Sequence, residues 1–280
     1  MPDPVNQHWL PQFMMAPWLE NDGRVLSFYR PFDKIVARRK SIKTLASEEN
    51  LYTAKWSGFE DAYFVEKVFA RLENSAALVR DKLINGKVGN LSAEEKEVLA
   101  FVLSMQLIRT PEKIQSGRTL GSEKFRESLS NSIQLDIAAG RVDSEDADRF
   151  ISDYGQDLLF KPLFEVAHKW AEKWLSLSWR VFDFSDCRLK LVLSDNPVQL
   201  FGDASNFKGA IVPVSPTVLL VVGDFPAWYE VKFSTEYREP FAIDCIGDQF
   251  RRSKKFVIAK LTEREEGYLS LAEKYMPRSG

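Results

Sequence analysis

Two histidines occur in the 280 residues, and one of them, His8, lies near the start of the chain in the stretch NQHWLPQF. An imidazole that titrates near neutral pH can act as a general acid or base, bind a metal ion, or anchor a chain terminus. Because Pro11 disfavours a helix at the residue before it, we expect His8 and Gln12 in an extended or irregular segment. The other histidine, His168, lies shortly before Trp170 and Trp174 in a helical pattern and is expected to be a packed or surface residue.

Arg109 is the second candidate, because the helical stripe of Val98, Val102 and Met105 continues onto it. Gln106 lies on an adjoining line of the same helix, so both side chains should meet one neighbour. A charge on an apolar stripe needs a partner, since an unpaired buried charge is costly. The guanidinium could bind an anionic ligand such as a carboxylate or phosphate. Alternatively, it is salt-bridged to an internal carboxylate or bonded to carbonyls at the helix end.

The third candidate is the stretch LVLSDNPVQLF, in which a strand runs into Ser194, Asp195 and Asn196 before a proline. Asp195 would lie at the end of a strand, where loops on a rigid scaffold often carry function. Asn196 precedes a proline and is biased towards extended or turn geometry. The alternative is an Asx-turn, in which one of these side chains bonds nearby backbone N–H groups.

Composition restricts the class of partner. The formal net charge of −2 gives no global attraction for nucleic acid, and the two basic clusters, residues 37–43 and 251–255, are of a kind that usually forms solvated faces. The cluster 251–255 and Arg109 are the sequence features through which a nucleic acid or nucleotide would bind. Cys187 and Cys245 lack metal-site spacing and are expected to be small buried residues in a reducing compartment.

Familiar catalytic motifs are missing from the sequence. It holds no glycine-rich phosphate loop, no G-x-S-x-G and no H-E-x-x-H. A divalent metal therefore has weak support, because one histidine and one aspartate are a small ligand set. The N-terminus lacks the features of a signal peptide, and the apolar run AIVPVSPTVLLVVG is too short to cross a bilayer. We expect a soluble cytoplasmic protein without a membrane partner.

The periodicity of apolar residues predicts the elements that position these candidates. Residues 24–30 and 34–40 alternate around PFD and indicate a β-hairpin, followed by a short turn of helix in SIKTLASEENLYT. From about 59 to 178 the period is helical. The expected helices cover about 59–83, 92–110, 121–139, 144–153 and 159–177. A capping box, SAEE, opens the second of them.

From about residue 179 the period becomes that of strands. A helix at about 240–253 precedes the last strand, and the capping box TERE at 262–265 opens a closing helix. This order predicts an α+β fold with an N-terminal hairpin, a central helical region and a mostly antiparallel C-terminal sheet that the hairpin joins. Since no Pro/Gly/Ser linker interrupts it, residues 1–280 are expected to form one integrated domain. Its sheet would come from 24–40 and 179–260. The expected strands are WRVFDF, LKLVLS, AIVPVS, TVLLVVG, YEVKFST and KFVIAK.

The quoted motifs occur in a characteristic order. NQHWLPQF, SIKTLASEENLYT, LSAEEKEVLAFVLSMQLIRTP, LVLSDNPV and AIVPVSPTVLLVV follow one another, and in this the chain resembles the bacterial family catalogued as domain of unknown function 4238. The resemblance covers nearly the whole chain and thins between about 112 and 178 and after 225. It implies membership without a reaction. By motif position the family's polar residues fall on His8, Gln12, Gln106, Arg109, Ser194, Asp195, Asn196 and Ser215.

We hypothesise that these residues converge on one polar pocket between the helices and the sheet. The first functional hypothesis is a hydrolase for a phosphate-containing substrate, nuclease-like or nucleotide-directed, and by association a toxin or phage-defence effector. His8 and Asp195 would be acid, base or metal ligands, and Arg109 would clamp the anion. The residues expected to bind and orient the substrate are Gln12, Gln106, Ser194, Asn196 and Ser215.

The rival hypothesis is a module that binds a partner, a protein among the candidates, without catalysis. The same polar residues would then be structural, with Arg109 paired to Asp195 and His8 pinning the N-terminal segment to the core. A third hypothesis is a sensor that recognises a small anion through Arg109.

Overall fold

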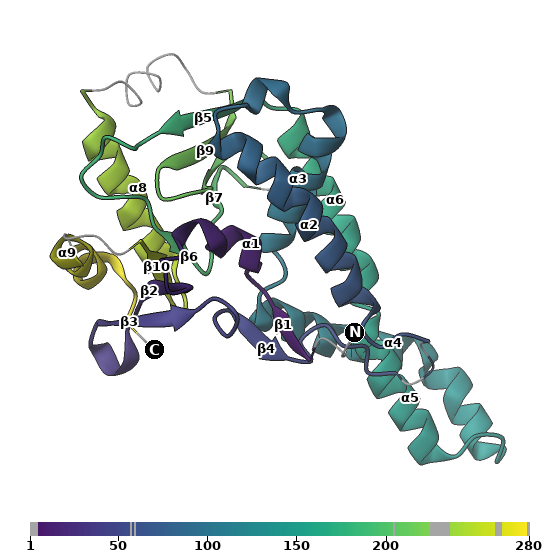
Figure 1. Cartoon of the computed structure of the whole chain (residues 1–280). Helices are drawn as coiled ribbons and strands as arrows, with labels where there is room; N and C mark the ends of the chain where they lie inside the picture. Colours follow the sequence, from purple (N-terminus) through teal and green to yellow (C-terminus); the bar gives the residue numbers. More distant parts are fainter. Residues whose placement is uncertain are drawn as a thin grey trace.

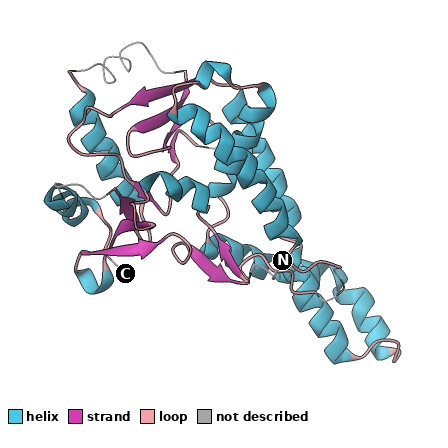
Figure 2. Ribbon diagram, viewed as in Figure 1, coloured by secondary structure: helices cyan, strands magenta, loops and turns pink. Residues whose placement is uncertain are grey.

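A computed structural model of the chain combines antiparallel sheets with a helical layer, as the α+β prediction requires (Figure 1, Figure 2). A long helical hairpin projects from the rest of the molecule. The residues that the structure describes are 5–56, 58, 60–203, 205–224, 236–260 and 265–278.

The first four-stranded sheet has the order β3-β2-β10-β6. Its hairpin consists of β2 (Arg24–Tyr29) and β3 (Val36–Ser41), which confirms the hairpin predicted from the alternating pattern. β2 pairs with β10 (Val257–Ala259), and β10 pairs in turn with β6 (Leu193–Ser194). The N-terminal hairpin therefore does join C-terminal strands.

The remaining C-terminal strands form a second sheet instead of extending the first one. Its order is β5-β9-β8-β7, with β5 Trp179–Asp183, β9 Val218–Gly223, β8 Gly209–Pro213 and β7 Gln199–Phe201. The prediction of a single C-terminal sheet is wrong. The chain turns at S-D-N-P after only two residues of β6, and β7, β8 and β9 after it belong to the second sheet. The predicted strand LKLVLS is a strand only in those two residues.

A third, two-stranded sheet pairs β1 (Asn6–His8) with β4 (Ser47–Glu49). It places His8 in extended backbone, as predicted, but the predicted turn of helix in SIKTLASEENLYT is wrong. Gln12 is not extended either, since it begins the short helix α1 (Gln12–Met15), and Pro11 stands just before the first turn, where a proline is tolerated.

Five helices follow in the described part of the chain, and α3 begins at the predicted capping box, in which Ser92 and Glu95 bond reciprocally. Four predicted boundaries are wrong by four residues or more. α2 begins at Phe64 instead of near 59, and α5 ends at Asp157 instead of near 153. α3 ends at Gln106, so Arg109 lies in the connection after the helix, and α4 begins at Pro111 instead of near 121, because proline at the first helical position needs no N–H partner. The helices are α2 Phe64–Ile84, α3 Ala93–Gln106, α4 Pro111–Ala138, α5 Ser144–Asp157 and α6 Phe160–Leu175.

α4 and α5 are the hairpin that projects from the molecule (Figure 1). Two glycines let them approach closely. A Cβ atom on Gly121 would lie 2.4 Å from the carbonyl oxygen of Gly155, and a Cβ on Gly155 would lie 2.8 Å from Cα of Ser122. At the base of the hairpin the buried guanidinium of Arg118 pairs with Asp157 at 3.3 Å.

Two further helices, α8 (Arg238–Arg252) and α9 (Glu265–Tyr275), pack beside the first sheet and confirm the two C-terminal helices. Phe28 of β2 contacts the rings of Phe250 and Tyr268 there. The predicted strand YEVKFST and the first three residues of the box TERE lie outside the described residues.

The main core lies between the second sheet, α1 and the helical layer. Trp18, in the 3-10 turn Ala16–Trp18, is fully buried and donates its indole N–H to the carbonyl of Leu191 at 2.8 Å. This bond ties the N-terminal segment to the strand region. Both cysteines are buried, as predicted, and burial raises the pKa of the Cys187 thiol to about 11. Within the described ranges, no helix has both the length and the apolar character needed to cross a bilayer.

Candidate functional site

The eight residues predicted from the sequence are distributed over four places. Three lie around β1, three at the end of β6, one in the turn between β8 and β9, and one at the exposed start of α1. In that order they are His8, Gln106 and Arg109, then Ser194, Asp195 and Asn196, then Ser215, and finally Gln12.

The side chain of Arg109 is 1% exposed, and internal partners take up its guanidinium group. Nη1 pairs with Oε1 of Glu73 at 2.8 Å, and Nε donates to the carbonyl of Trp9 at 2.9 Å. The guanidinium carbon lies 5.0 Å from the centre of the Phe69 ring, close enough for a cation–π contact. The structure thus places Arg109 against an internal carboxylate. That carboxylate is Glu73, and the expected pairing of Arg109 with Asp195 is wrong.

Gln106 meets the same neighbour as Arg109, as their spacing predicted. When its amide nitrogen donates to the carbonyl of Trp9 at 3.0 Å, its amide oxygen accepts from Nε and Nη2 of Arg109 at 2.9 and 3.1 Å. These bonds hold the end of α3 against the chain that follows β1. Such a network satisfies the buried polar groups and leaves few donors for a ligand.

Two carboxylates on α2 complete this cluster, and the sequence analysis missed them. Glu66, Phe69 and Glu73 are spaced by three and four residues and therefore lie on one face of the helix. Burial raises the pKa of Glu66 to about 7, the negative charge of Glu73 adds to this shift, and Arg109 opposes it. The signal that could have revealed them is the position of both acids beside Phe69 of the apolar stripe.

Tyr52 and Gln7 are two further polar residues of this region that sequence reasoning missed. The buried Tyr52 hydroxyl donates to the carbonyl of Arg109 at 2.9 Å, and burial raises its pKa. Gln7, on β1, is also buried, accepts from the backbone N–H of Tyr52 and donates to Thr53 at 2.9 Å. Both side chains fasten the segment after β4 to β1 and to the α3–α4 connection.

His8 is half-buried, and its Nε2 lies 3.2 Å from the carbonyl of Ile42. Because a carbonyl only accepts, Nε2 carries the proton in this bond. Burial lowers the pKa of His8, while the bonds to backbone and the charge of Glu73 oppose the shift. A neutral imidazole donating to the backbone is an anchor for β1, which is the structural role foreseen as the alternative.

Asp195 is the most deeply buried of the candidate acids at 6% exposure. Its two carboxylate oxygens accept from the backbone N–H groups of Lys254 and Lys255 at 2.9 and 2.8 Å. Burial raises the pKa of Asp195 to about 6, and these two bonds oppose the shift. The carboxylate therefore holds the connection between α8 and β10. The carboxylate does bond backbone N–H groups, but they lie far away in sequence, so the expected Asx-turn of Asp195 to nearby N–H groups is wrong.

The neighbours of Asp195 are structural in the same way. The hydroxyl of Ser194 donates to the side-chain oxygen of Gln249 at 2.8 Å and accepts from the N–H of Asn196 at 3.3 Å. Gln249 in turn donates to the carbonyl of Pro197 at 3.0 Å. Ser215 lies in another turn, where its hydroxyl accepts from the N–H of Val218 at 2.9 Å.

Lys255 lies between the two main groups of candidate residues, the one around β1 and the one at the end of β6. Its backbone bonds Asp195, and its ammonium nitrogen pairs with Glu48 at 2.9 Å and lies 4.5 Å from the centre of the Trp9 ring. His8 and Asp195 are thus linked through the surroundings of Lys255, but the structure gives no contact between them, and the convergence on one polar pocket stays a prediction. Their polar atoms face different backbone partners, and the cavities described next are lined by other residues.

A basic groove of about 590 Å³ lies beside the connection between α8 and β10 that the Asp195 carboxylate holds. The end of β2, the connection between α8 and β10, and the chain after α9 form it. Six cationic side chains line this groove, and its described lining includes no carboxylate. The lining residues are Tyr29, Arg30, Pro31, Arg251, Arg252, Ser253, Lys254, Lys255, Met276, Pro277 and Arg278.

Some of the cationic side chains in the groove already have partners within the protein. Arg251 pairs with Asp248, and Arg252 donates to the carbonyl of Val198. Arg30 donates to the carbonyl of Glu273 at 2.9 Å.

Lys255 is bound as well, since it pairs with Glu48, and two cations of the groove remain. Among the described residues, neither Lys254 nor Arg278 has an acidic side chain as an ion-pair partner. These two are therefore the cations of the groove that a ligand could engage without displacing an ion pair or a hydrogen bond made by the described residues.

Phe32 lies next to this groove in the turn Pro31–Asp33 between β2 and β3. Its side chain is 95% exposed, and its backbone adopts φ 51° and ψ 45°. A bulky residue in the left-handed region is strained, and such strain is found most often at binding sites. The turn holds an aromatic ring out into solvent beside Arg30 and Pro31.

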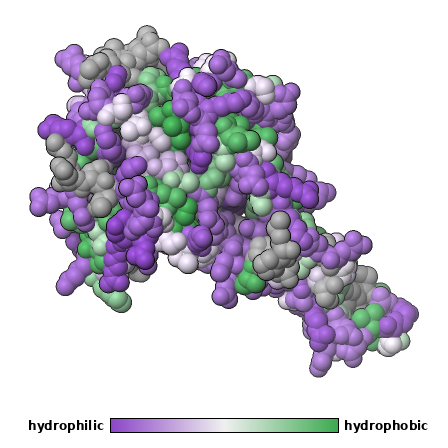
Figure 3. Space-filling model, in the orientation of Figure 1, coloured by the Kyte–Doolittle hydropathy of each residue, from purple (hydrophilic) through white to green (hydrophobic). Residues whose placement is uncertain are grey.

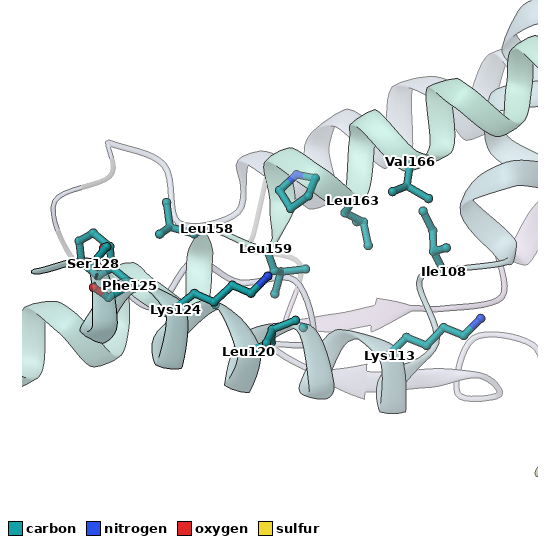
Figure 4. A pocket seen from close by; sticks show the side chains of 13 residues that line it. Ile108, Lys113, Leu120, Lys124, Phe125, Ser128, Leu158, Leu159, Leu163 and Val166 are labelled. Atoms are coloured by element: carbon teal, nitrogen blue, oxygen red, sulfur yellow. Dashed lines mark hydrogen bonds between the residues drawn. The ribbon is translucent and has the colours of Figure 1, made fainter.

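Two of the other cavities are lined mainly by apolar residues. Hydrophilic residues cover most of the face shown in Figure 3, and apolar residues gather in the region of α2 and α3. A cavity of about 550 Å³ lies between α2, α3 and α6, and includes His168 in its lining. Another, of about 540 Å³, lies between α4 and α6 (Figure 4). In the described part of the chain, no three His, Cys, Asp or Glu side chains are grouped to hold a metal ion.

A family model described as "Protein of unknown function (DUF4238)" matches residues 6–240. The comparison with curated proteins returned no match, and neither did the comparison with solved structures.

Proposed function

The chain belongs to the DUF4238 family, and we propose that this protein is a binding module that holds single-stranded nucleic acid in its basic groove. The observation that carries the proposal is the lining of that groove, in which six cationic side chains surround about 590 Å³ without a carboxylate. The net charge of the chain is −2, so this concentration of cations is local and not a consequence of overall composition.

The phosphate backbone is the ligand chemistry that such a groove favours. Lysine and arginine side chains bind phosphates and release condensed counterions, which makes binding strong at low salt. Lys254 and Arg278 supply charges that form no ion pair among the described residues, although the charge of Lys254 also acts on Glu112. Arg30, which donates to the carbonyl of Glu273, and Lys255, which pairs with Glu48, also line the groove.

Phe32 is the reason to propose an unpaired strand. An aromatic ring that faces solvent beside a cationic groove can stack on a base, and this stacking is independent of sequence. A duplex hides the faces of its bases, whereas a single strand exposes them. The strained backbone at Phe32 keeps the ring outside the core and ready for such a contact.

The test is a fluorescence-anisotropy titration with a labelled single-stranded oligonucleotide at two salt concentrations. We expect Lys254→Glu to weaken binding and to reduce the salt slope by about 0.7 for each phosphate that the protein no longer neutralises. Phe32→Ala should weaken single-strand binding about tenfold and leave duplex binding unchanged. Lys87→Glu is the matched control, because Lys87 is exposed beyond the end of α2 and does not line the groove.

Two results would contradict the proposal. One is an oligonucleotide that fails to bind at low salt, and the other is an equal loss of affinity in Lys254→Glu and Lys87→Glu. If Lys254→Glu lowers the affinity for the oligonucleotide and Phe32→Ala does not, the groove remains the binding site and stacking of a base on Phe32 is rejected.

The hydrolase predicted from the sequence has less support, because its proposed catalytic residues are bonded to the backbone. His8 donates to Ile42, and Asp195 accepts from Lys254 and Lys255. The hydrolase and the toxin or phage-defence role stay predictions. Cleavage of the same oligonucleotide in the presence of a divalent metal, lost in His8→Ala, would favour the hydrolase over the binding module.

A further inference from the structure

The cavity between α4 and α6 is a second site, independent of the basic groove. Its volume of about 540 Å³ is within the range of pockets that hold small ligands. Figure 4 shows α4 on one side, the start of α6 on the other, and Ile108 of the α3–α4 connection closing one end. None of its lining residues belongs to the polar clusters described above.

The walls of this cavity are aliphatic. Leu163 and Val166 of α6 and Ile108 lie close together at one end, and Leu158 and Leu159 lie towards the other (Figure 4). Leucine and valine side chains on the rim are unusually exposed for their type, with Leu120 at 50%. A contiguous apolar surface of this kind is a common sign of a binding site.

Helix packing leaves the space open. The contact between Gly121 and Gly155 fixes α4 close to α5, so α4 cannot move towards α6 to fill the gap. Gly117 lines the cavity without a side chain, and a Cβ atom there would meet only the side chain of Leu159, at 3.5 Å.

Two lysines supply the charge of the cavity, and no acidic residue is among the described residues that line it. The side chain of Lys124 extends from α4 towards Leu159, so its ammonium group faces the hollow (Figure 4). Lys113 lies at the opposite end of the lining, where its ammonium donates to the carbonyl of Leu107. Lys124 has no ion-pair partner among the described residues. An apolar hollow with a cation directed into it is complementary to an alkyl chain with an anionic head.

We propose that the cavity between α4 and α6 binds a linear carboxylate with a long alkyl chain, a ligand of the fatty-acid type. The carboxylate pairs with Lys124. The alkyl chain lies along Leu159 and Leu163 towards Ile108. Binding removes the exposed part of Leu120 from water, and this burial of apolar surface supplies most of the affinity.

The experiment is isothermal titration of the full chain with dodecanoate below its micelle concentration. Dodecanol, with the same chain and no charge, is the ligand control. We expect Lys124→Met to weaken dodecanoate binding about fivefold, the upper end for an ion pair at a partly exposed site, and to leave dodecanol binding unchanged. Lys124→Arg should restore the affinity. Lys169→Met is the matched control, because Lys169 is exposed on α6 outside the cavity.

A second variant tests the location without changing charge. Gly117→Leu places a side chain in the cavity and should abolish binding of both ligands, while far-UV circular dichroism and the melting temperature report whether the fold is intact. Three results would overturn the proposal: no heat from dodecanoate, equal affinity for dodecanoate and dodecanol, or binding that survives in a folded Gly117→Leu. An acidic amphipathic peptide that binds where dodecanoate does not would also overturn it, in favour of a protein partner.

Discussion

Replacing Arg109 by methionine separates a structural arginine from an anion clamp. The change keeps a long apolar side chain against Phe69 but removes the partner of Glu73 and the donor to Trp9. Breaking a buried ion pair at one side costs about 3–5 kcal/mol, and because the Glu73 side chain left behind is 22% exposed, we expect the lower end of this range, about 3 kcal/mol. We expect Arg109→Met to lower the free energy of unfolding by that amount, as measured by urea denaturation.

A double-mutant cycle with Glu73→Gln assigns this loss to the pair. In the double variant neither charge remains, so the combined loss should be smaller than the sum of the two single losses by at least about 1 kcal/mol. A folded Arg109→Met that loses less than about 1 kcal/mol would refute the structural role. If inorganic phosphate then raised the melting temperature of the original chain and not that of Arg109→Met, the guanidinium would be the anion clamp that the sequence first suggested.

Two further predictions concern buried groups elsewhere. Burial raises the pKa of Asp195 from 3.8 to about 6, so the folded state retains a proton that the unfolded state releases within this window. The free energy of unfolding should therefore fall by about 3 kcal/mol as the pH rises through this window. Urea denaturation at several pH values should show this fall in the original chain and not in Asp195→Asn. Identical pH profiles of the two proteins would contradict the assignment to Asp195. Gly121→Ala should destabilise by about 1–3 kcal/mol because its Cβ would lie against the carbonyl of Gly155, whereas Gly117→Ala, with room for a Cβ, should be neutral or stabilising by thermal denaturation. Equal effects of the two alanines would exclude the close contact as the cause.

The elements that were predicted correctly are those whose signal is local. The hairpin 24–40 alternates in polarity, and the capping box at Ser92 marks the start of α3 within a few residues. The pairing of β1 with β4 was missed because Ser47–Glu49 is polar and its partner is far away in sequence. The start of α4 was missed because Gly117 and Gly121 weaken the helical signal.

None of the eight candidate residues predicted from the sequence lines the basic groove, and only parts of their local arrangement could be predicted. The spacing of Gln106 and Arg109 correctly indicated a shared neighbour, yet Glu73 could be identified only once α2 was packed against α3. Asp195 was placed correctly at a strand end, but the N–H groups that it binds belong to Lys254 and Lys255. Tertiary pairing of this kind has no periodic trace in one sequence. That residues 1–280 form one domain stays a prediction.

The position of β10 also has a consequence for how the chain reaches its fold. β10 is the only strand that joins β2 to β6 within the described sheet, and most of the chain separates it from β2. During synthesis the hairpin of β2 and β3 leaves the ribosome long before β10 does, with one edge of backbone N–H and C=O groups open to other chains. The sheet therefore closes as a late, long-range step, which is slow compared with formation of the helical layer. The distance in sequence between β2 and β10 therefore sets how long the open edge of the hairpin is exposed to aggregation.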